Sequence, residues 1–342
     1  MLTTRDRPSP ALAAFADSGD GRADWIRPAL GYLLAAAGLI WVLHDFQWDR
    51  WRGLTANLDW RWIAPAVACD LVSYLCQGAR WRLLLKPRAQ ISTWRTTQAI
   101  YAGLFTNEIL PMRLGEMVRA YLVSRWTAVR MIELIPSMVA ERLFDGLWLA
   151  AGIGVTALAA PIPGELRSAA GMLGAGFVAA AATMFYLARR PLNPARSFRS
   201  RWPALSSWLE RLSSGWRSLG EPRVCALSLI WSLAILTLQA LAFWLVMIGC
   251  GLHLSIWIGV ACFLITHLGT AIPNAPANVG AYQFFTVAGL TLFGVDKNAA
   301  TVFSLIVFAV LTLPLLMLGF LALSRSGTSL AKIRREAQTP AP

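Results

Sequence analysis

Long apolar segments, each close to the length of a membrane-crossing helix, constrain the fold of this chain more than any other feature. About 20 consecutive apolar residues are needed to cross the hydrocarbon core of a bilayer. The six stretches that approach or reach this length are residues 28–44, 62–80, 132–160, 168–188, 224–249 and 299–323. Of the 342 residues 56% are hydrophobic and only 14% charged, which leaves little sequence for a soluble domain. The sequence therefore predicts an all-α polytopic membrane protein.

The charged residues indicate topology and not a nucleic-acid partner. The formal net charge is +13, but the arginines cluster beside the apolar stretches, as in cytoplasmic loops of membrane proteins. No nucleic-acid-binding module is visible, so we expect no nucleic-acid partner. The basic segments that we assign to the cytoplasm are 80–95, 119–130, 189–223 and the tail after residue 325. The predicted organisation is a disordered cytoplasmic tail, a transmembrane domain and a second cytoplasmic tail, at residues 1–27, 28–325 and 326–342.

Two further apolar regions, 97–112 and 256–293, are interrupted by Pro, Asn and Gly and do not have the pattern of simple spans. Backbone that leaves the helical conformation inside a bilayer must be sheltered by protein or water. Because basic segments flank the first region on both sides, residues 97–118 are predicted to enter and leave from the cytoplasm. Region 256–293 must enter and leave from outside, either as a re-entrant hairpin or as two short spans. We expect about six full spans and two re-entrant helical hairpins.

The two broken regions occupy corresponding places in two similar halves. Residues 62–160 and 224–323 each run span, broken hairpin, span, in opposite orientations, and each hairpin carries a Pro-x-x-x-Gly motif, starting at Pro111 and Pro276. An inverted repeat of this kind places a binding site near the midplane of the bilayer, where the broken helices meet. The alternative is coincidence, because Pro and Gly are common in membrane helices.

Three arginines are the strongest candidates for binding a charged ligand. Arg113 and Arg119 follow the break of the first hairpin, and Arg142 lies in the next apolar stretch, where a charge is costly. A guanidinium fork matches a phosphate group bidentately, and such bonds are strong in a sheltered site. We predict that these arginines hold the phosphate or another anion of a lipid head group.

Acidic residues accompany the arginines. Glu116 lies between Arg113 and Arg119, while Glu141 and Asp145 are four residues apart and therefore share one helical face. We expect these three carboxylates to orient the arginines. The alternative is a purely structural network that fixes the hairpin against the helix.

Neutral residues complete the predicted site. Asn107 in the first hairpin and Asn274 in the second supply polar groups, and Gly115 and Gly280 allow a backbone to approach closely. We expect all four to contact the ligand. Because Ala favours the helical conformation, the double variants Pro111→Ala with Gly115→Ala and Pro276→Ala with Gly280→Ala are expected to keep the fold but to close the cavity.

Asp70 is a separate candidate, for binding a proton. It shares one helical face with Ser73 and Gln77, so this face should point into the bundle. Hydrogen bonds between helices account for Ser73 and Gln77, but a carboxyl group in a span is less easily explained in that way.

No metal or cofactor site is predicted. The five cysteines contain no CxxC motif, and the three histidines are scattered along the chain. A structural or catalytic zinc site needs such ligands at short, regular spacing.

Three polar motifs carry a resemblance to a known family. They are Asn107-x3-Pro111-x-Arg113-x-Gly115-Glu116-x2-Arg119, Glu141-Arg142-x2-Asp145 and Pro273-x2-Pro276-x3-Gly280. Over about residues 60–325 they resemble the lysylphosphatidylglycerol synthase transmembrane-region family. That family includes the flippase part of the bacterial multiple-peptide-resistance factor and stand-alone membrane proteins of hopanoid or glycolipid pathways. The resemblance implies a lipid-translocating bundle in the bacterial inner membrane.

The chain departs from the family pattern in two places. No soluble aminoacyl-transferase domain follows residue 325, so lysine transfer is not expected of this chain. Ala277 and Asn278 stand where many relatives have a Gly-rich stretch.

The resulting hypothesis is a flippase, not an enzyme, that moves a polar or anionic glycolipid or a hopanoid-type lipid between leaflets. Two alternatives stay open: an intramembrane lipid-modifying transferase with Glu116 or Asp145 as base, and an accessory subunit of a hopanoid or glycolipid pathway. The expected partners are membrane lipids and, for the accessory role, lipid-biosynthesis enzymes; no oligomeric state is predicted.

Overall fold

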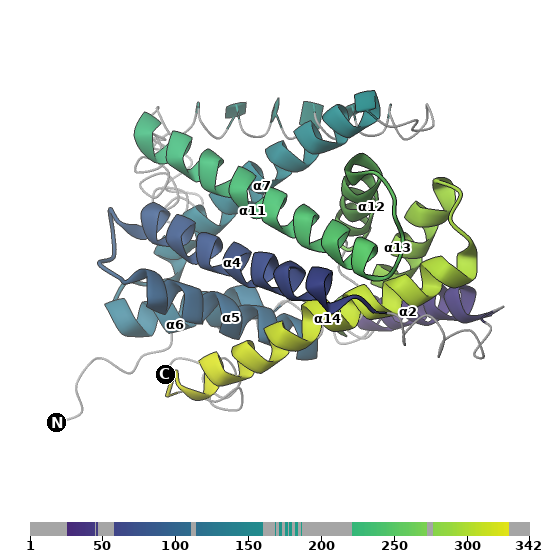
Figure 1. Cartoon of the computed structure of the whole chain (residues 1–342). Helices are drawn as coiled ribbons and strands as arrows, with labels where there is room; N and C mark the ends of the chain where they lie inside the picture. Colours follow the sequence, from purple (N-terminus) through teal and green to yellow (C-terminus); the bar gives the residue numbers. More distant parts are fainter. Residues whose placement is uncertain are drawn as a thin grey trace.

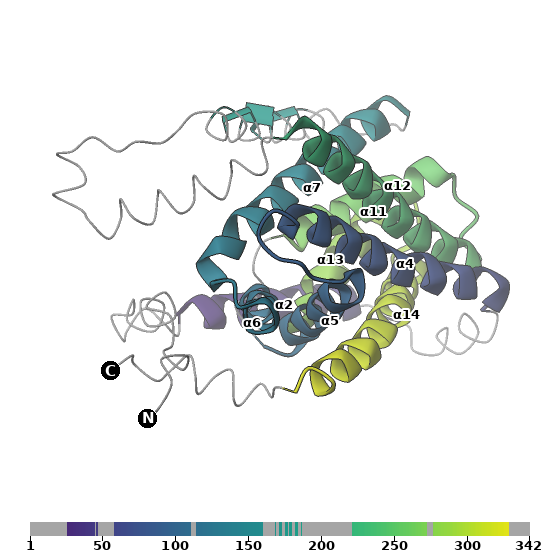
Figure 2. The same cartoon turned by 90° about the vertical axis from the view of Figure 1, so that its left-hand side faces the viewer.

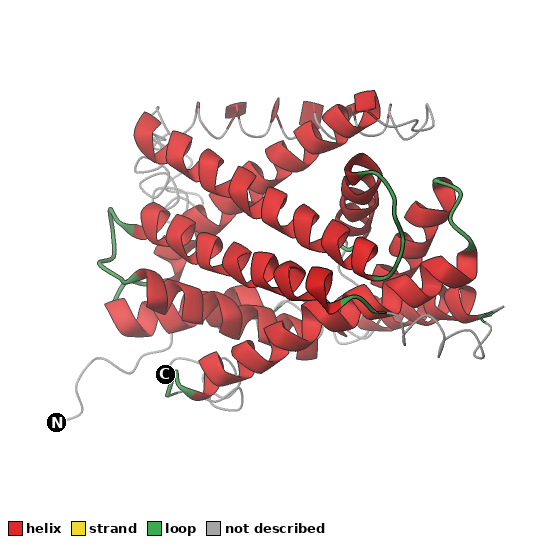
Figure 3. Cartoon of the chain, in the orientation of Figure 1, coloured by secondary structure: helices red, strands yellow, loops and turns green. Residues whose placement is uncertain are grey.

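The computed structural model describes residues 26–44, 46, 58–110, 114–159, 221–271 and 276–327, with scattered positions between 168 and 186. Within these residues the chain forms nine α-helices and one short 3-10 turn at Pro276–Asn278, and no strand (Figure 3). The predicted all-α class is confirmed. Two helices, Pro222–Gly249 and Lys297–Ser324, are long and apolar enough to cross a membrane by the criteria of length and composition.

The helices agree closely with the apolar stretches of the sequence. They are α2 (Ile26–Leu43), α4 (Trp60–Leu85), α5 (Thr93–Ile109), α6 (Gly115–Thr127), α7 (Met131–Ala159), α11 (Pro222–Gly249), α12 (Ile256–Gly269), α13 (Ala281–Leu292) and α14 (Lys297–Ser324). Five of the six predicted spans correspond to α2, α4, α7, α11 and α14. The remaining span, 168–188, and the two predicted tails lie largely or wholly outside the described residues.

Local sequence signals set several helix ends. The side chains of Asp59, Ser92 and Asp296 accept hydrogen bonds from the first backbone N–H groups of α4, α5 and α14, which satisfies donors that a helix leaves free. Helix α5 ends at Ile109 because Leu110 precedes a proline and takes an extended backbone conformation, with φ −103° and ψ 141°. The proline that was expected to break the first hairpin thus acts through the residue before it.

Two long helices, α4 and α11, form an antiparallel pair through the middle of the molecule (Figure 1). The backbone N–H of Asp59 donates to the carbonyl oxygen of Gly249 at 3.0 Å, so the start of α4 meets the end of α11. Helices α5 and α6 form one helical hairpin and α12 and α13 another. Figure 2 shows α7 and α14 on opposite sides of the bundle.

The packing of the two halves is reciprocal. Helix α5 of the first hairpin packs against α14, the last helix of the other half, and α12 of the second hairpin packs against α7, the last helix of the first half. Helix α2 lies outside this repeated pattern and packs against α13. Each hairpin is therefore held between its own half and the long helix of the other.

Aromatic side chains fill the core between the helices. Phe243 of α11 and Phe303 of α14 are almost fully buried and meet edge to face, with ring centroids 5.2 Å apart. Trp81 of α4 is fully buried near the other end of the pair. The burial of this ring matters for the site, because a charged side chain lies over it.

Candidate functional site

The first hairpin is held closed by a very close approach of its two helices. A Cβ atom at Gly115 would overlap the carbonyl oxygen of Gly103, and one at Gly103 would lie 2.7 Å from the carbonyl oxygen of Gly115. The backbone N–H of Gly115 donates to Asn107 Oδ1 at 2.7 Å, so Asn107 satisfies a free donor at the start of α6. A Cβ atom at position 115 would therefore force α5 and α6 apart at this crossing.

Charged side chains from α6, α7 and α4 form an alternating series of ion pairs. Arg119 Nε lies 2.7 Å from Glu116 Oε2, and Arg119 Nη2 lies 2.8 Å from Glu141 Oε2. Arg80 continues the series, with Nη2 3.4 Å from Glu141 Oε1 and donating to Asp145 Oδ2 at 3.1 Å. At the other end Arg142 donates to Glu116 Oε1. The complete series is Arg142, Glu116, Arg119, Glu141, Arg80 and Asp145.

Burial changes along this series. The side chain of Arg142 is 64% exposed and that of Asp145 31%, whereas those of Arg80 and Glu141 are each 3% exposed. A charge buried without a partner costs far more than an exposed one, and breaking a buried pair costs about 3–5 kcal/mol. The middle of the series therefore fixes the geometry, and its ends are available to a ligand.

Arg119 is held on three sides. Its guanidinium carbon lies 4.8 Å from the ring centroid of Trp81, in addition to the two carboxylates. The indole N–H of Trp81 donates to Ser137 Oγ at 3.1 Å, which fixes the orientation of the ring. With these contacts Arg119 is suited to positioning Glu116 and Glu141. It is less suited to releasing these carboxylates in exchange for a ligand anion.

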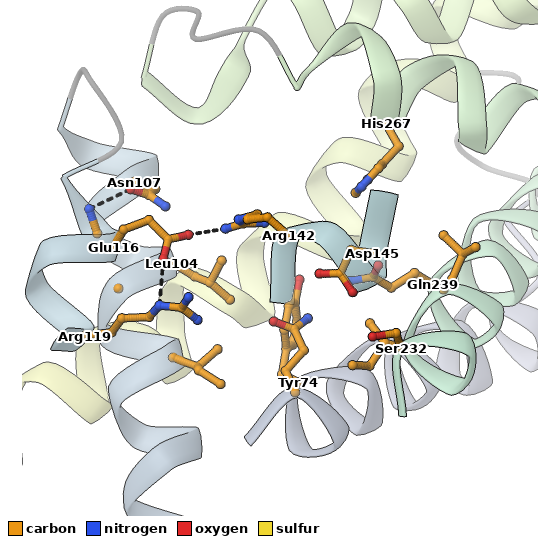
Figure 4. Close-up of a pocket in the computed structure, with 16 residues that line it drawn as sticks. Tyr74, Leu104, Asn107, Glu116, Arg119, Arg142, Asp145, Ser232, Gln239 and His267 are labelled. Carbon is orange, nitrogen blue, oxygen red and sulfur yellow. Dashed lines mark hydrogen bonds and ion pairs between the residues drawn. The ribbon is translucent and has the colours of Figure 1, made fainter. Parts of the chain in front are cut away.

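A cavity of about 210 Å³ lies at the exposed edge of the series. Figure 4 shows Glu116, Arg119, Arg142 and Asp145 around this space, with His267 pointing into it from the second hairpin. Neutral polar groups of the central pair complete the wall. They are Tyr74 and Gln77 of α4 and Ser232 and Gln239 of α11. The cavity thus combines a charged wall from the first half with a neutral wall to which both halves contribute.

Most predicted site residues come together here. The predicted site residues that line the cavity are Asn107, Gly115, Glu116, Arg119, Arg142 and Asp145. Glu141 lies behind them, bridging Arg80 and Arg119. The structure brings neither Asp70 nor Gly280 into the lining, and Arg113 and Asn274 lie outside the described residues.

Gly280 permits a close backbone approach, as expected, but the partner is another helix. Its φ is +87°, and a Cβ atom there would overlap the carbonyl oxygen of Ala35 in α2. The backbone N–H of Gly280 donates to Gln283 Oε1 at 2.7 Å. Gly280 thus packs against α2 and does not line the cavity, and its contact with a ligand stays a prediction.

Sequence reasoning missed Arg80 as a site residue. It was placed at the start of the basic segment 80–95, but α4 continues through Leu85 and the Arg80 side chain is buried. Arg80 also donates to Ser232 Oγ at 2.5 Å, which links the charged series to the second half. A signal was present, because Arg80 stands three residues after Gln77 and continues the polar face that begins at Asp70. Tyr74 lies on the same face, four residues after Asp70, whereas no comparable pattern marks Gln239 or His267.

No metal centre emerges from the part of the chain that the structure describes. Nowhere in it do three or more His, Cys, Asp or Glu side chains gather in a way that could hold a metal ion. The arrangement is instead suited to binding a polar or charged organic group through guanidinium, carboxylate and amide contacts.

Comparison with known proteins places most of the chain in one family of membrane proteins. The model of the family described as lysylphosphatidylglycerol synthase TM region matches residues 29–319. A similar curated protein, glycosyltransferase AglD of Haloferax volcanii, is 26% identical over 277 residues, which cover 70% of this chain and 44% of that protein. The chain therefore spans less than half the length of this relative. No solved structure matches the chain. The chain belongs to the lysylphosphatidylglycerol synthase transmembrane-region family and is a multi-pass membrane protein.

Proposed function

We propose that this protein is a lipid flippase of a bacterial inner membrane, which moves a polar or anionic lipid such as a glycolipid or hopanoid-type lipid between leaflets. The observation that carries the proposal is a cavity lined by ion-paired arginines and carboxylates inside an apolar helical bundle. Charged groups at membrane depth are expensive and mark the paths of polar substrates. Such a cavity lowers the cost of moving a charged head group through hydrocarbon.

The size of the cavity supports binding of a head group and not of a whole lipid. Pockets that enclose an entire drug-sized ligand measure about 300–1,000 Å³, and this cavity measures about 210 Å³. The acyl chains would stay outside, along apolar helix faces such as the exposed side chains Leu313, Met317 and Phe320 of α14.

Arg142 is the proposed anion-binding residue of the described site. Its exposed guanidinium pairs with Glu116 at the cavity edge, so a phosphate can replace that carboxylate as its partner. Arg119 and Arg80 hold Glu116, Glu141 and Asp145 in place from behind. Arg113, which lies between α5 and α6 in the sequence and outside the described residues, is a second candidate contact for the anion.

The proposed route uses both hairpins. The reciprocal packing of α5 on α14 and of α12 on α7 supports an inverted repeat, with the hairpins entering from opposite sides of the membrane and both chain ends in the cytoplasm. The cavity borders α5 and α6 of one hairpin and His267 of the other, so a head group held there is within reach of both. Movement of the hairpins relative to α4 and α11 would open the cavity to each leaflet in turn.

The experiment that tests this proposal is lipid transfer by the purified full chain in vesicles. A trace of acyl-labelled fluorescent phosphatidylglycerol is placed in both leaflets, and an impermeant reductant then bleaches the outer leaflet. With the protein present we expect nearly all of the fluorescence to be lost, and without it only the outer-leaflet half. Protection of the inner-leaflet half in protein-containing vesicles, with every polar lipid tried, would contradict the proposal.

A second candidate function follows from the name of the relative. Glycosyltransferase AglD matches this chain over 44% of its length, which favours a membrane module that takes part in sugar transfer to a lipid. Incubation of the purified chain with radiolabelled lipid and sugar-donor precursors would separate the two candidates. A glycosylated lipid product that depends on Glu116 or Asp145 favours the transferase.

A further inference from the structure

A buried carboxyl group lies apart from the ion-pair series. Asp70 of α4 is 5% exposed, and its side chain is hydrogen-bonded by the hydroxyl of Tyr74, one turn further along the helix. Each carboxylate of the series has at least one arginine partner. In the described part of the chain, no ion pair to Arg, Lys or His involves Asp70.

The surroundings of Asp70 come from α4 and from both hairpins. Tyr101 of α5 and Tyr282 of α13 interact electrostatically with Asp70. Glu108 of α5 is a second acidic group that interacts with Tyr282 and with Tyr74. On α4 itself the titratable neighbours are Cys69 and Tyr74. The rings of Tyr74 and Tyr101 lie in contact, with centroids 5.3 Å apart.

The other helices packed on α4 bring no cation to Asp70. Residues 224–249 of α11 and 298–324 of α14 contain no acidic or basic side chain, and the charged residues in the middle of α7 belong to the ion-pair series. A carboxylate buried without a cation pays a large desolvation cost, which a bound proton removes. A tyrosine hydroxyl can donate to the ionised carboxylate or accept from the protonated carboxyl, so it serves both states.

Tyr74 connects this carboxyl to the site. It hydrogen-bonds Asp70 and also lines the cavity, so the acidic group has a polar neighbour at the cavity wall. We propose that Asp70 is a proton-binding site in contact with the cavity through Tyr74, and that its protonation drives the hairpin movements that carry lipid between leaflets. This inference rests on the proposed flippase function and adds the proton gradient as its energy source.

The coupling follows from burial. With Asp70 neutral, α5 packs on α4 and, together with Tyr282 of α13, keeps water away from the carboxyl group. When Asp70 loses its proton, the charge favours a conformation in which water reaches it, and α5 and Tyr282 must move away from Asp70. Proton uptake from one side and release to the other would then favour transport in one direction.

The test uses the full chain in vesicles with a gradient of one pH unit, applied in either direction, and fluorescent phosphatidylglycerol as the probe. One pH unit corresponds to a tenfold ratio of proton activity, so coupling of one proton to one lipid shifts the leaflet distribution by up to about tenfold. Asp70→Asn should abolish this shift. Asp59→Asn is the matched control, because Asp59 is an exposed acid at the start of the same helix and Asn caps helices equally well. It should respond like the wild type.

A second measurement does not depend on transport. Infrared spectra of the purified protein during a pH titration should contain the C=O band of a protonated carboxyl that disappears in Asp70→Asn. If Asp70→Asn does not fold, Tyr74→Phe removes the hydroxyl contact and should weaken the response to the gradient.

The outcomes separate the two proposals. Wild-type protein that transfers no lipid refutes the flippase function and with it the coupling, while the infrared band still decides whether Asp70 binds a proton. Transfer that is indifferent to the gradient, or an Asp70→Asn variant that responds like the wild type, overturns the coupling alone. An Asp70 carboxylate that stays ionised over the whole pH range overturns proton binding.

Discussion

The two helical hairpins share a layout and differ in chemistry. In the first, α5 and α6 carry Asn107, Glu116 and Arg119 to the cavity and are tied to α7 and α4 by ion pairs. In the second, α13 meets α2 through Gly280 and carries neutral and aromatic side chains. His267 is its one contribution to the cavity lining among the described residues. Two similarly packed hairpins thus differ in chemistry: the first carries charged residues to the cavity, and the second is packed mainly through neutral side chains.

This difference indicates how the two hairpins work. Ion pairs at a cavity edge can exchange a carboxylate for a ligand anion, because both offer the same kind of oxygen acceptor. Close packing of a helix backbone against a glycine has no such exchangeable group. We therefore expect the first hairpin to bind and release the head group and the second to hold the framework.

The largest expected effect is on stability, from removal of the central carboxylate of the series. Glu141→Gln leaves Arg80 and Arg119 each with one fewer acidic partner in a buried site, and we expect it to lower the free energy of unfolding by about 3–5 kcal/mol. Gln283→Leu in the second hairpin frees only the Gly280 N–H and should cost about 1–3 kcal/mol. Denaturant unfolding in detergent micelles measures both. Equal losses of unfolding free energy in the two variants would contradict the claim that the ion pairs of the first hairpin stabilise the fold more than the Gly280 contact of the second.

The next effect compares the two glycines. Gly280→Ala should cost about 2–4 kcal/mol, because it combines a left-handed φ with overlap on Ala35. Gly115→Ala lacks the backbone strain and should cost about 1–3 kcal/mol through overlap on Gly103. Gly154→Ala on α7 is the control, since a Cβ there meets nothing within 4 Å. Unfolding midpoints decide the order, and a neutral Gly280→Ala would show that α2 does not hold the second hairpin.

A smaller effect is expected on transfer alone. Arg142→Leu removes one charge-assisted contact worth about 1.5–3 kcal/mol, so lipid transfer should slow by roughly ten- to a hundredfold. Stability should change little because the Arg142 side chain is 64% exposed. Gln239→Leu, on the neutral wall, should slow transfer by no more than about tenfold, the effect of a neutral hydrogen bond. The vesicle assay compares the transfer rates of the two variants. A larger loss of transfer rate for Gln239→Leu would show that the head group binds mainly to the α11 side of the cavity.

Apolar length and the position before Pro111 sufficed to predict most of the described helices, because these signals act locally. The basic segments 80–95 and 119–130 concealed the end of α4 and most of α6, which continue to Leu85 and Thr127. Residues of the polar motifs on α5, α6 and α7 come together around one cavity, as predicted. Arg80 was missed because arginines beside the apolar stretches were taken to mark cytoplasmic loops. That assignment does not consider which face of a helix an arginine occupies. Gly280 was predicted to contact the ligand, because a sequence does not show which backbone will approach a glycine. In the structure the backbone that approaches Gly280 is that of Ala35.

Photocrosslinking tests the central claim, that a lipid head group occupies this cavity, most directly. The full chain in vesicles is irradiated with a phospholipid that carries a photoreactive group on its head, and the labelled peptides are identified by mass spectrometry. We expect label on cavity residues such as Leu104, Ile235 and Leu236, and less of it in Arg142→Leu. Label confined to exposed side chains such as Met317 and Phe320, unchanged in that variant, would contradict the account.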